Sequence, residues 1–272
     1  MSRSRSGPVT GALVAAGLSL ALVRSEERWP RAVRGPMFRR NFAGREVTLA
    51  EGPAWVIGAA GGALVAADPA AAIVVAAPGL VGLVDDLVGD TAVKGLSGHL
   101  RALRRGRVTS GVLKIGVLAV SALVAATHDQ SARGVGSAPR LQALVDAGVI
   151  AGTANLVNLF DLRPGRALKV SLALGAPLLL ASPGVRPGVA AGLGATVGVL
   201  PIDLAGRAML GDCGANASGA LLGQASVRAM PPRGRLLTLG AIAGLTLLSE
   251  RVSFSAVIEG NPLLRRIDEW GR

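Results

Sequence analysis

Acidic side chains stand at three points of the sequence where an apolar stretch begins or ends. The adjacent pair Asp85 and Asp86 ends one such stretch. Asp161 follows another, and Asp212 comes just before a third. Ionised groups beside hydrocarbon-like segments are costly, so they are candidates for function. Neighbouring carboxylates can divide the work, one binding a metal ion and the other handling a proton or acting as nucleophile. The plainer interpretation of the pair is an exposed cap at a helix end.

Two amides precede Asp161 at regular intervals. Asn155, Asn158 and Asp161 are spaced i, i+3, i+6, which predicts that they lie along one side of a helix near its end. Amide groups in an apolar helix need partners. They could bond neighbouring helices, which contributes about 0.6 kcal/mol per contact. Alternatively, they could form a polar wall that faces a bound phosphate, metal or sugar.

Glycines flank the third acid in the segment Gly211-Asp212-Cys213-Gly214. Glycine allows the backbone to approach a ligand closely. The helix expected after this segment would direct its first N–H groups at any nearby phosphate. A simple turn is the alternative for a single acid between glycines.

Basic residues follow the acid pair, and others fill the first long polar segment. Lys94 and Lys114 could neutralise a pyrophosphate, whereas anchoring on the inner side of a membrane accounts for most arginines. Mg²⁺ takes oxygen ligands and bridges carboxylates to substrate phosphates. The chain has only two histidines and one cysteine. The supply of acids, amides and lysines therefore favours a magnesium–phosphate site over a zinc site.

The segments that must position these groups are expected to be membrane-spanning helices. Half of the residues are hydrophobic and 17% are charged, against about a quarter in soluble proteins. The mean hydropathy is +0.50. This composition predicts an all-α, polytopic integral membrane protein with about nine transmembrane helices of roughly 20 residues. The ranges that fit are 8–24, 52–67, 69–84, 111–127, 141–159, 167–183, 187–204, 214–230 and 236–250.

The distribution of Lys and Arg predicts the orientation of these helices. With the N-terminus outside, the inner segments hold 21 of the 29 basic residues, which favours an N-out, C-in arrangement. The acids then also lie inside, so we expect a cytoplasmic-face active-site cleft in a multi-pass protein of the plasma membrane. We divide the chain into a transmembrane domain, 1–250, and a cytoplasmic amphipathic tail, 251–272. Topology and anionic headgroups explain the net charge of +12, so the expected partner is the lipid bilayer and no nucleic acid.

The order of these motifs resembles a known family. An Asp-Asp pair, an Asn-x-x-Asn-x-x-Asp motif and a Gly-Asp-x-Gly motif occur in the order of the polyprenyl-phosphate N-acetylhexosamine-1-phosphate transferases. This glycosyltransferase family 4 includes phospho-N-acetylmuramoyl-pentapeptide transferase. The segments 40–45 and 94–98 also resemble the family's first cytoplasmic loop and the segment after its acid pair. The resemblance covers about residues 35–250.

The resemblance implies a reaction and a set of residues. A sugar-1-phosphate would pass from a nucleotide-sugar, UDP-linked in the family, to polyprenyl phosphate for cell-envelope glycan synthesis, with Mg²⁺ as cofactor. By position, Asp212 and Asp86 would bind the metal, and Asp85 would deprotonate or orient the lipid phosphate. The implied substrate-binding residues are Lys94 and Lys114 for phosphate charge, Asn155, Asn158 and Asp161 for the nucleotide-sugar side, and Arg40 and Asn41 in the first loop.

The sequence also departs from the family pattern. Pro164 stands where the family has a second acid, no histidine follows His128, and nine expected spans compare with ten or more in the family. These departures favour a second hypothesis, a non-catalytic relative that binds a lipid-linked or nucleotide ligand. A small transporter is a third, but no repeat is evident and the acids lie at the membrane edge. Gly219 and Gly223 form a small-xxx-small pair, which favours close helix packing, and the small-residue faces also permit a homodimer.

Overall fold

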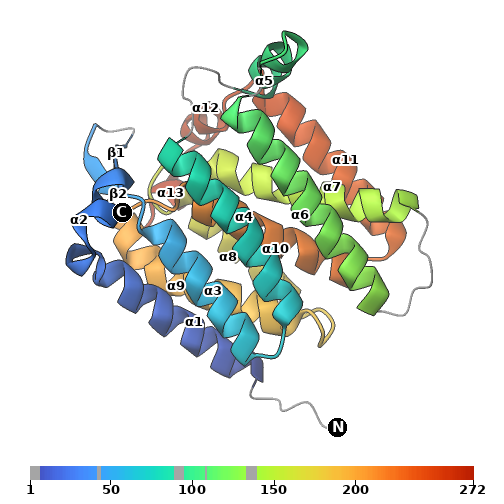
Figure 1. Ribbon diagram of the computed structural model, residues 1–272, viewed down its shortest axis with the longest axis horizontal. Coiled ribbons are helices and arrows are strands. Elements are labelled where there is room, and N and C mark those ends of the chain that lie inside the picture. The colour runs from blue at the N-terminus through green and yellow to red at the C-terminus, as the bar shows by residue number, and fades with distance from the viewer. Residues whose placement is uncertain (1–6, 42–43, 89–94, 108, 133–139) are drawn as a thin grey trace.

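A computed structural model describes the chain at residues 7–41, 44–88, 95–107, 109–132 and 140–272. It is a bundle of helices with one small β-hairpin, so the prediction of an all-helical fold is confirmed (Figure 1). Each predicted apolar range coincides, within a few residues, with one helix of the bundle. These helices are α1 (Gly7–Arg24), α3 (Glu51–Val65), α4 (Pro69–Val88), α6 (Ser110–Ala132), α7 (Arg140–Phe160), α8 (Arg166–Leu178), α9 (Arg186–Leu204), α10 (Gly211–Ala229) and α11 (Pro232–Ser249).

Shorter elements connect these helices and end the chain. Between α1 and α3 the chain forms η1 (Glu26–Arg28), α2 (Arg31–Arg34), η2 (Gly35–Met37), β1 (Phe38–Arg40) and β2 (Glu46–Thr48). Before α6 lies α5 (Gly95–Arg104), and after α11 follow α12 (Phe254–Gly260) and α13 (Pro262–Glu269).

Several helices have the length and composition of membrane spans. Among the described helices, α1, α4, α7 and α9 are long and apolar enough to cross a membrane. The pair α11 and α12 passes the same test together, although the chain bends by 87° between them. Large apolar side chains such as Ile73, Leu80 and Leu237 are exposed, as expected for contact with lipid. These features support a membrane protein, while nine crossings and their orientation stay predictions.

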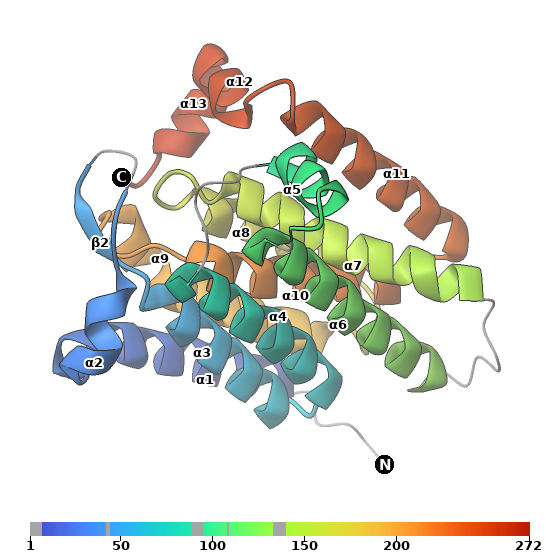
Figure 2. The same ribbon diagram turned by 45° about the horizontal axis from the view of Figure 1, so that its top comes forward.

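Helix α10 occupies the centre of the bundle and is buried along most of its length (Figures 1 and 2). It packs against α3, α4, α7, α8 and α9. A methyl group at Gly219 would lie 2.5 Å from the Ala154 Cα, and one at Gly223 would lie 2.7 Å from the Ile150 Cα. These glycines therefore bring α10 against α7 within one chain, so they do not supply a face for a dimer.

Buried charges near the C-terminal end of α10 are paired. Arg235 of α11 contacts both carboxylate oxygens of Asp146 in α7, at 3.2 and 3.0 Å. Arg228 of α10 contacts Asp68, in the turn between α3 and α4, at 2.9 Å. Removing one partner of such a pair would leave an uncompensated buried charge, which is strongly destabilising. These ion pairs hold α7, α10, α11 and the α3–α4 turn together at this end.

The β-hairpin fixes the first polar loop beside the start of α10. The Asn41 side chain accepts a hydrogen bond from the Arg45 N–H at 3.0 Å and so shapes the hairpin turn. Strand β2 then bridges to the connection between α9 and α10, where the Met209 N–H donates to the Thr48 carbonyl at 3.0 Å. The segment that leads into α10 is therefore held by backbone hydrogen bonds.

A close approach of α4 to α10 predicts that Gly82→Ala destabilises the fold. A methyl group at Gly82 would collide with the Asp212 carbonyl, so the two helices would have to separate. We expect a loss of about 1–3 kcal/mol, read as a lower Tm in detergent. Gly244→Ala in α11 is the control, because a methyl group there meets nothing within 4 Å. Equal Tm values for the two variants would contradict the close packing.

Candidate functional site

The first turn of α10 receives carboxylates from two other helices. The Asp212 N–H donates to Asp86 Oδ1 at 3.0 Å, and the Cys213 N–H donates to Asp86 Oδ2 at 2.9 Å. The Gly211 N–H interacts with the carboxyl group of Asp161 and lowers the pKa of that group. The first N–H groups of a helix have no acceptor within the helix and carry partial positive charge, so carboxylates are stabilised there. The expectation that these groups face a substrate phosphate is wrong for Asp212 and Cys213, because Asp86 takes that place.

Glycine is required where these carboxylates meet the backbone. Gly211 has φ of +61°, a conformation that other residues adopt only with strain. A Cβ atom at this position would also lie 2.8 Å from Asp86 Oδ2. The glycine before Asp212 therefore allows the backbone approach that the sequence predicted, but to a protein carboxylate.

The predicted acids converge at this end of the bundle. Asp161 follows the last residue of α7. Burial raises the pKa of Asp161 most, and the negative charge of Asp203 raises it further. Asp86 and Asp212 also raise the pKa of Asp161, while the Gly211 N–H lowers it. Residues from the ends of α4, α7 and α9 thus interact electrostatically at the start of α10. Asp85 is partly buried in the last turn of α4, next to Asp86.

Two further acids belong to this cluster and were missed in the sequence. Glu51 begins α3 and is fully buried, and neither of its carboxylate oxygens has a hydrogen-bond partner within the described chain. Asp203, in the last turn of α9, interacts electrostatically with the Gly165 N–H, and its Oδ2 atom has no hydrogen-bond partner within the described chain. The charges of Asp203 and Asp161 both act on Glu51. An ionisable residue inside an apolar run is a candidate functional residue. Asp203 lies inside such a run, so the sequence alone could have identified it.

The side chains of this cluster are carboxylates, which are the type of oxygen ligand that Mg²⁺ takes. No three His, Cys, Asp or Glu side chains of the described residues are placed to form a complete metal site. Mg²⁺ is usually held by one or two carboxylates together with substrate phosphates and water, so a complete protein cage is not required. Both Asp86 oxygens accept N–H groups at the start of α10.

The remaining predicted site residues lie in different settings. Asn158 is partly buried in the last turn of α7, whereas Asn155 is exposed, so the predicted polar wall is shorter than expected. Arg40 is exposed at the end of β1. Lys94 lies outside the described residues, and Lys114 is in α6 with its side chain outside the description.

A basic residue of the first loop does reach the acid pair. Arg39 of β1 donates a hydrogen bond through Nη2 to the main-chain carbonyl of Asp86. It also donates through Nη1 to the carbonyls of Pro36 and Phe38, at 2.8 and 2.7 Å. Arg39 therefore links the β-hairpin of β1 and β2 to the end of α4.

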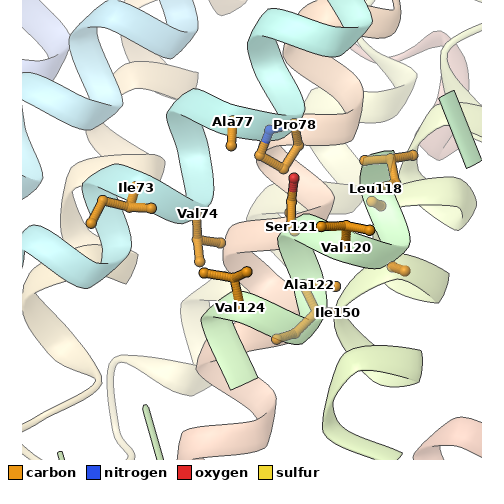
Figure 3. A pocket seen from close by; sticks show the side chains of 13 residues that line it. Ile73, Val74, Ala77, Pro78, Leu118, Val120, Ser121, Ala122, Val124 and Ile150 are labelled. Carbon is orange, nitrogen blue, oxygen red and sulfur yellow. The ribbon is translucent and has the colours of Figure 1, made fainter. Parts of the chain in front are cut away.

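An apolar cavity of about 160 Å³ lies between α4 and α6 (Figure 3). Helices α7 and α10 complete its walls, and Ser121 is its one polar side chain among those that line it. Pro78 lines the cavity eight residues before Asp86, which corresponds to about 12 Å along the helix. Apolar cavities of about 150 Å³ can accept molecules the size of benzene. The cavity therefore offers a hydrocarbon-binding site at some distance from the acids. Its lining residues are Ile73, Val74, Ala77, Pro78, Leu118, Val120, Ser121, Ala122, Val124, Ile150, Ala151, Ala154 and Ala220.

Comparison of the chain with models of protein families and with curated proteins gives no match. The site itself consists of clustered carboxylates at the start of α10, with the β-hairpin beside them and an apolar cavity along α4.

The raised pKa of Asp161 predicts that Asp161→Asn flattens the pH dependence of stability when divalent cations are absent. An unfolded Asp has a pKa of about 3.9. Because folding raises this pKa, the folded state binds the proton more tightly and loses stability as the pH rises through the raised value. As the pH rises above about 3.9, the wild-type Tm in detergent should fall relative to that of the variant until the carboxyl group has ionised in the folded state. Parallel Tm profiles would contradict the raised pKa.

Proposed function

We propose that this protein transfers a sugar-1-phosphate from a nucleotide-sugar, UDP-linked, to polyprenyl phosphate at the cytoplasmic face of the plasma membrane. The observation that carries the proposal is the meeting of Asp86 and Asp161 at the first turn of α10, beside Asp212. These are the acids of the three motifs that resemble the transferase family. The proposal includes nine membrane crossings with the N-terminus outside and the C-terminus inside.

The number of acidic side chains at the start of α10 supports Mg²⁺ as the cofactor. Asp212 and Asp86 would hold Mg²⁺ together with the phosphates of the donor. When bound, the ion would neutralise negative charge that develops on the transferred phosphoryl group. The buried Glu51 and the mutual repulsion of the carboxylates support a cation at this place.

The reaction requires one bond to form and one to break. A phosphate oxygen of the lipid attacks the β-phosphorus of the nucleotide-sugar, and the bond between that phosphorus and the bridging oxygen of UMP breaks. UMP leaves with the electron pair, and the sugar remains on the transferred phosphate. Asp85 orients the lipid phosphate or accepts its proton. The protein contributes mainly by holding the two substrates in line for attack.

The acceptor and the donor would approach from different sides. A short stretch of the lipid's hydrocarbon chain would lie in the apolar cavity between α4 and α6, from which α4 leads to the acid pair. Asn158 and Asp161 face the nucleotide-sugar, and Lys94 and Lys114 bind phosphate charge. This division explains why one helix carries both an apolar cavity wall and two carboxylates.

Nucleotide release tests this function directly. The purified protein in detergent is supplied with Mg²⁺, polyprenyl phosphate and a panel of nucleotide-sugars, and nucleoside monophosphate release is measured. We expect Asp212→Asn to lower the rate by about 100-fold or more. Glu27→Gln, which changes an exposed carboxylate, is the control and should keep the wild-type rate. A wild-type protein that releases no monophosphate from any donor would refute the enzymatic proposal.

The acceptor site is tested in the same assay with Ser121→Phe. The larger side chain would fill the cavity, so the KM for polyprenyl phosphate should rise several-fold while the KM for the donor stays unchanged. Val117→Phe is the matched control, because Val117 is an exposed residue of α6 that does not line the cavity. An unchanged acceptor KM would exclude the cavity as the hydrocarbon site.

A non-catalytic role is the second candidate, and one observation favours it. Pro164, in place of an acid, uses its carbonyl to accept a hydrogen bond from Arg272 Nε at 2.8 Å. This part of the loop therefore anchors the C-terminus. Binding of a nucleotide-sugar without release of a monophosphate would support this candidate.

A further inference from the structure

The connection from α7 to α8 is held from two sides. On one side it faces the acid cluster, because Asp161 interacts electrostatically with the Gly211 N–H and the Gly165 N–H interacts with Asp203. On the other side lies the C-terminal hairpin, formed by α12 and α13 (Figure 2). The short segment that carries a site acid is therefore enclosed between the acid cluster and the end of the chain.

A buried ion pair makes the main contact between the connection and the hairpin. Arg166 Nε lies 2.7 Å from Asp268 Oδ1, and Arg166 Nη2 lies 2.9 Å from Asp268 Oδ2. Arg166 also donates through Nη1 to the Ser255 hydroxyl at 2.7 Å. Both members of the pair are buried, and such two-pronged pairs are the strongest of their kind. Arg166 thereby fixes α12 and α13 to the start of α8.

The position of Arg166 requires such a partner. A cation in the first turn of a helix opposes the positive end of the helix dipole, and a buried cation also loses its hydration. Burial alone would raise the pKa of Asp268, but hydrogen bonds and charge from Arg166, with Arg272, hold that pKa below its ordinary value. The pair is therefore charged at neutral pH, and each member depends on the other.

Further contacts tie the hairpin to the same segment. Lys169 Nζ donates to the carbonyls of Ile267 and Asp268, at 3.1 and 2.7 Å, where α13 ends. Arg272 contacts Asp268 at 3.0 Å and the Pro164 carbonyl at 2.8 Å. The charges of Arg272 and Lys169 also act on Asp203. The hairpin therefore reaches the acid cluster electrostatically as well as through the connection.

An aromatic stack and an exposed ion pair complete this contact. Phe160, next to Asp161, stacks on Phe254 of α12 with 5.1 Å between the ring centroids. Arg163 pairs with Glu259 at 2.6 Å, and this pair is much more exposed than that of Arg166. The hairpin thus contacts the chain immediately before and after Asp161.

We propose that the C-terminal hairpin is a strap that holds the Asp161 connection against the acid cluster, with Arg166 and Asp268 as positioning residues. The proposal rests on the proposed function for its effect on the reaction. Neither residue contacts the reacting groups, and both act through Asp161 and Asp203. Without the strap, the connection loses its outer contacts and the two acids lose their fixed placement.

Amide hydrogen exchange on the full-length protein tests the strap without any activity. In Asp268→Asn, exchange of residues 161–168 should accelerate about tenfold or more, while exchange in the middle of α10 stays at the wild-type rate. Asp268→Glu, which keeps the charge, should restore part of the protection. Glu259→Gln is the matched control, because it removes only the exposed pair of the same hairpin and should leave the rate within about twofold.

A kinetic readout separates positioning from a general loss of folding. We expect Asp268→Asn to raise the KM for the nucleotide-sugar and leave the KM for polyprenyl phosphate unchanged, because only the donor side depends on Asp161. A smaller fraction of folded protein would lower the apparent kcat alone.

Three results would overturn the strap. They are unchanged exchange at 161–168 in Asp268→Asn, acceleration that extends equally through α10, and equal effects of Asp268→Asn and Glu259→Gln. A wild-type protein without transferase activity would remove the proposed reaction, and the exchange measurements would still decide whether the strap exists.

Discussion

The start of α10 is the point on which the arrangement depends. The N–H groups of Asp212 and Cys213 donate there to the carboxylate of Asp86 from α4, and the Gly211 N–H interacts with Asp161, which follows α7. Each of these carboxylates would be costly to bury alone, and each unsatisfied N–H group would be costly as well. The positive end of the helix satisfies both needs, provided that glycine at 211 lets the backbone turn there. Elements distant in sequence are thereby drawn into one site.

This interaction leaves a charge imbalance that gives the site its chemical character. At the other end of α10, buried acids are paired with Arg228 and Arg235. At the start of α10, by contrast, Glu51 has two carboxylate oxygens without a hydrogen-bond partner in the described chain. A cation that arrives with phosphate groups would complete such a site, and a lipid chain in the nearby cavity would orient the acceptor. The proposed C-terminal strap would hold the Asp161 connection in place on the proposed donor side.

Much of the fold and part of the site could be predicted from the sequence, for physical reasons. Apolar runs of nearly 20 residues predicted the helices, and Asp86, Asp161 and Asp212 stood at run edges, where charge is costly. Contacts between residues far apart in the sequence could not be predicted from local spacing. Asp86 bonds a residue 126 positions away, and Arg166 pairs with one 102 positions away. The i, i+3, i+6 spacing could not show that Asn155 would be exposed, because exposure depends on which neighbours cover a helix. Glu51 was missed because a single acid at a helix start is ordinary.

Hydrogen exchange at the individual amides of Gly211, Asp212 and Cys213, followed by NMR on the labelled protein, measures the central interaction most directly. The first amides of a helix normally exchange rapidly, because they lack acceptors within the helix. If Asp86 and Asp161 bind them, all three should exchange as slowly as amides in the middle of α10, and Asp86→Asn should accelerate Asp212 or Cys213. Rapid exchange of these amides in the wild-type protein would contradict the proposed arrangement.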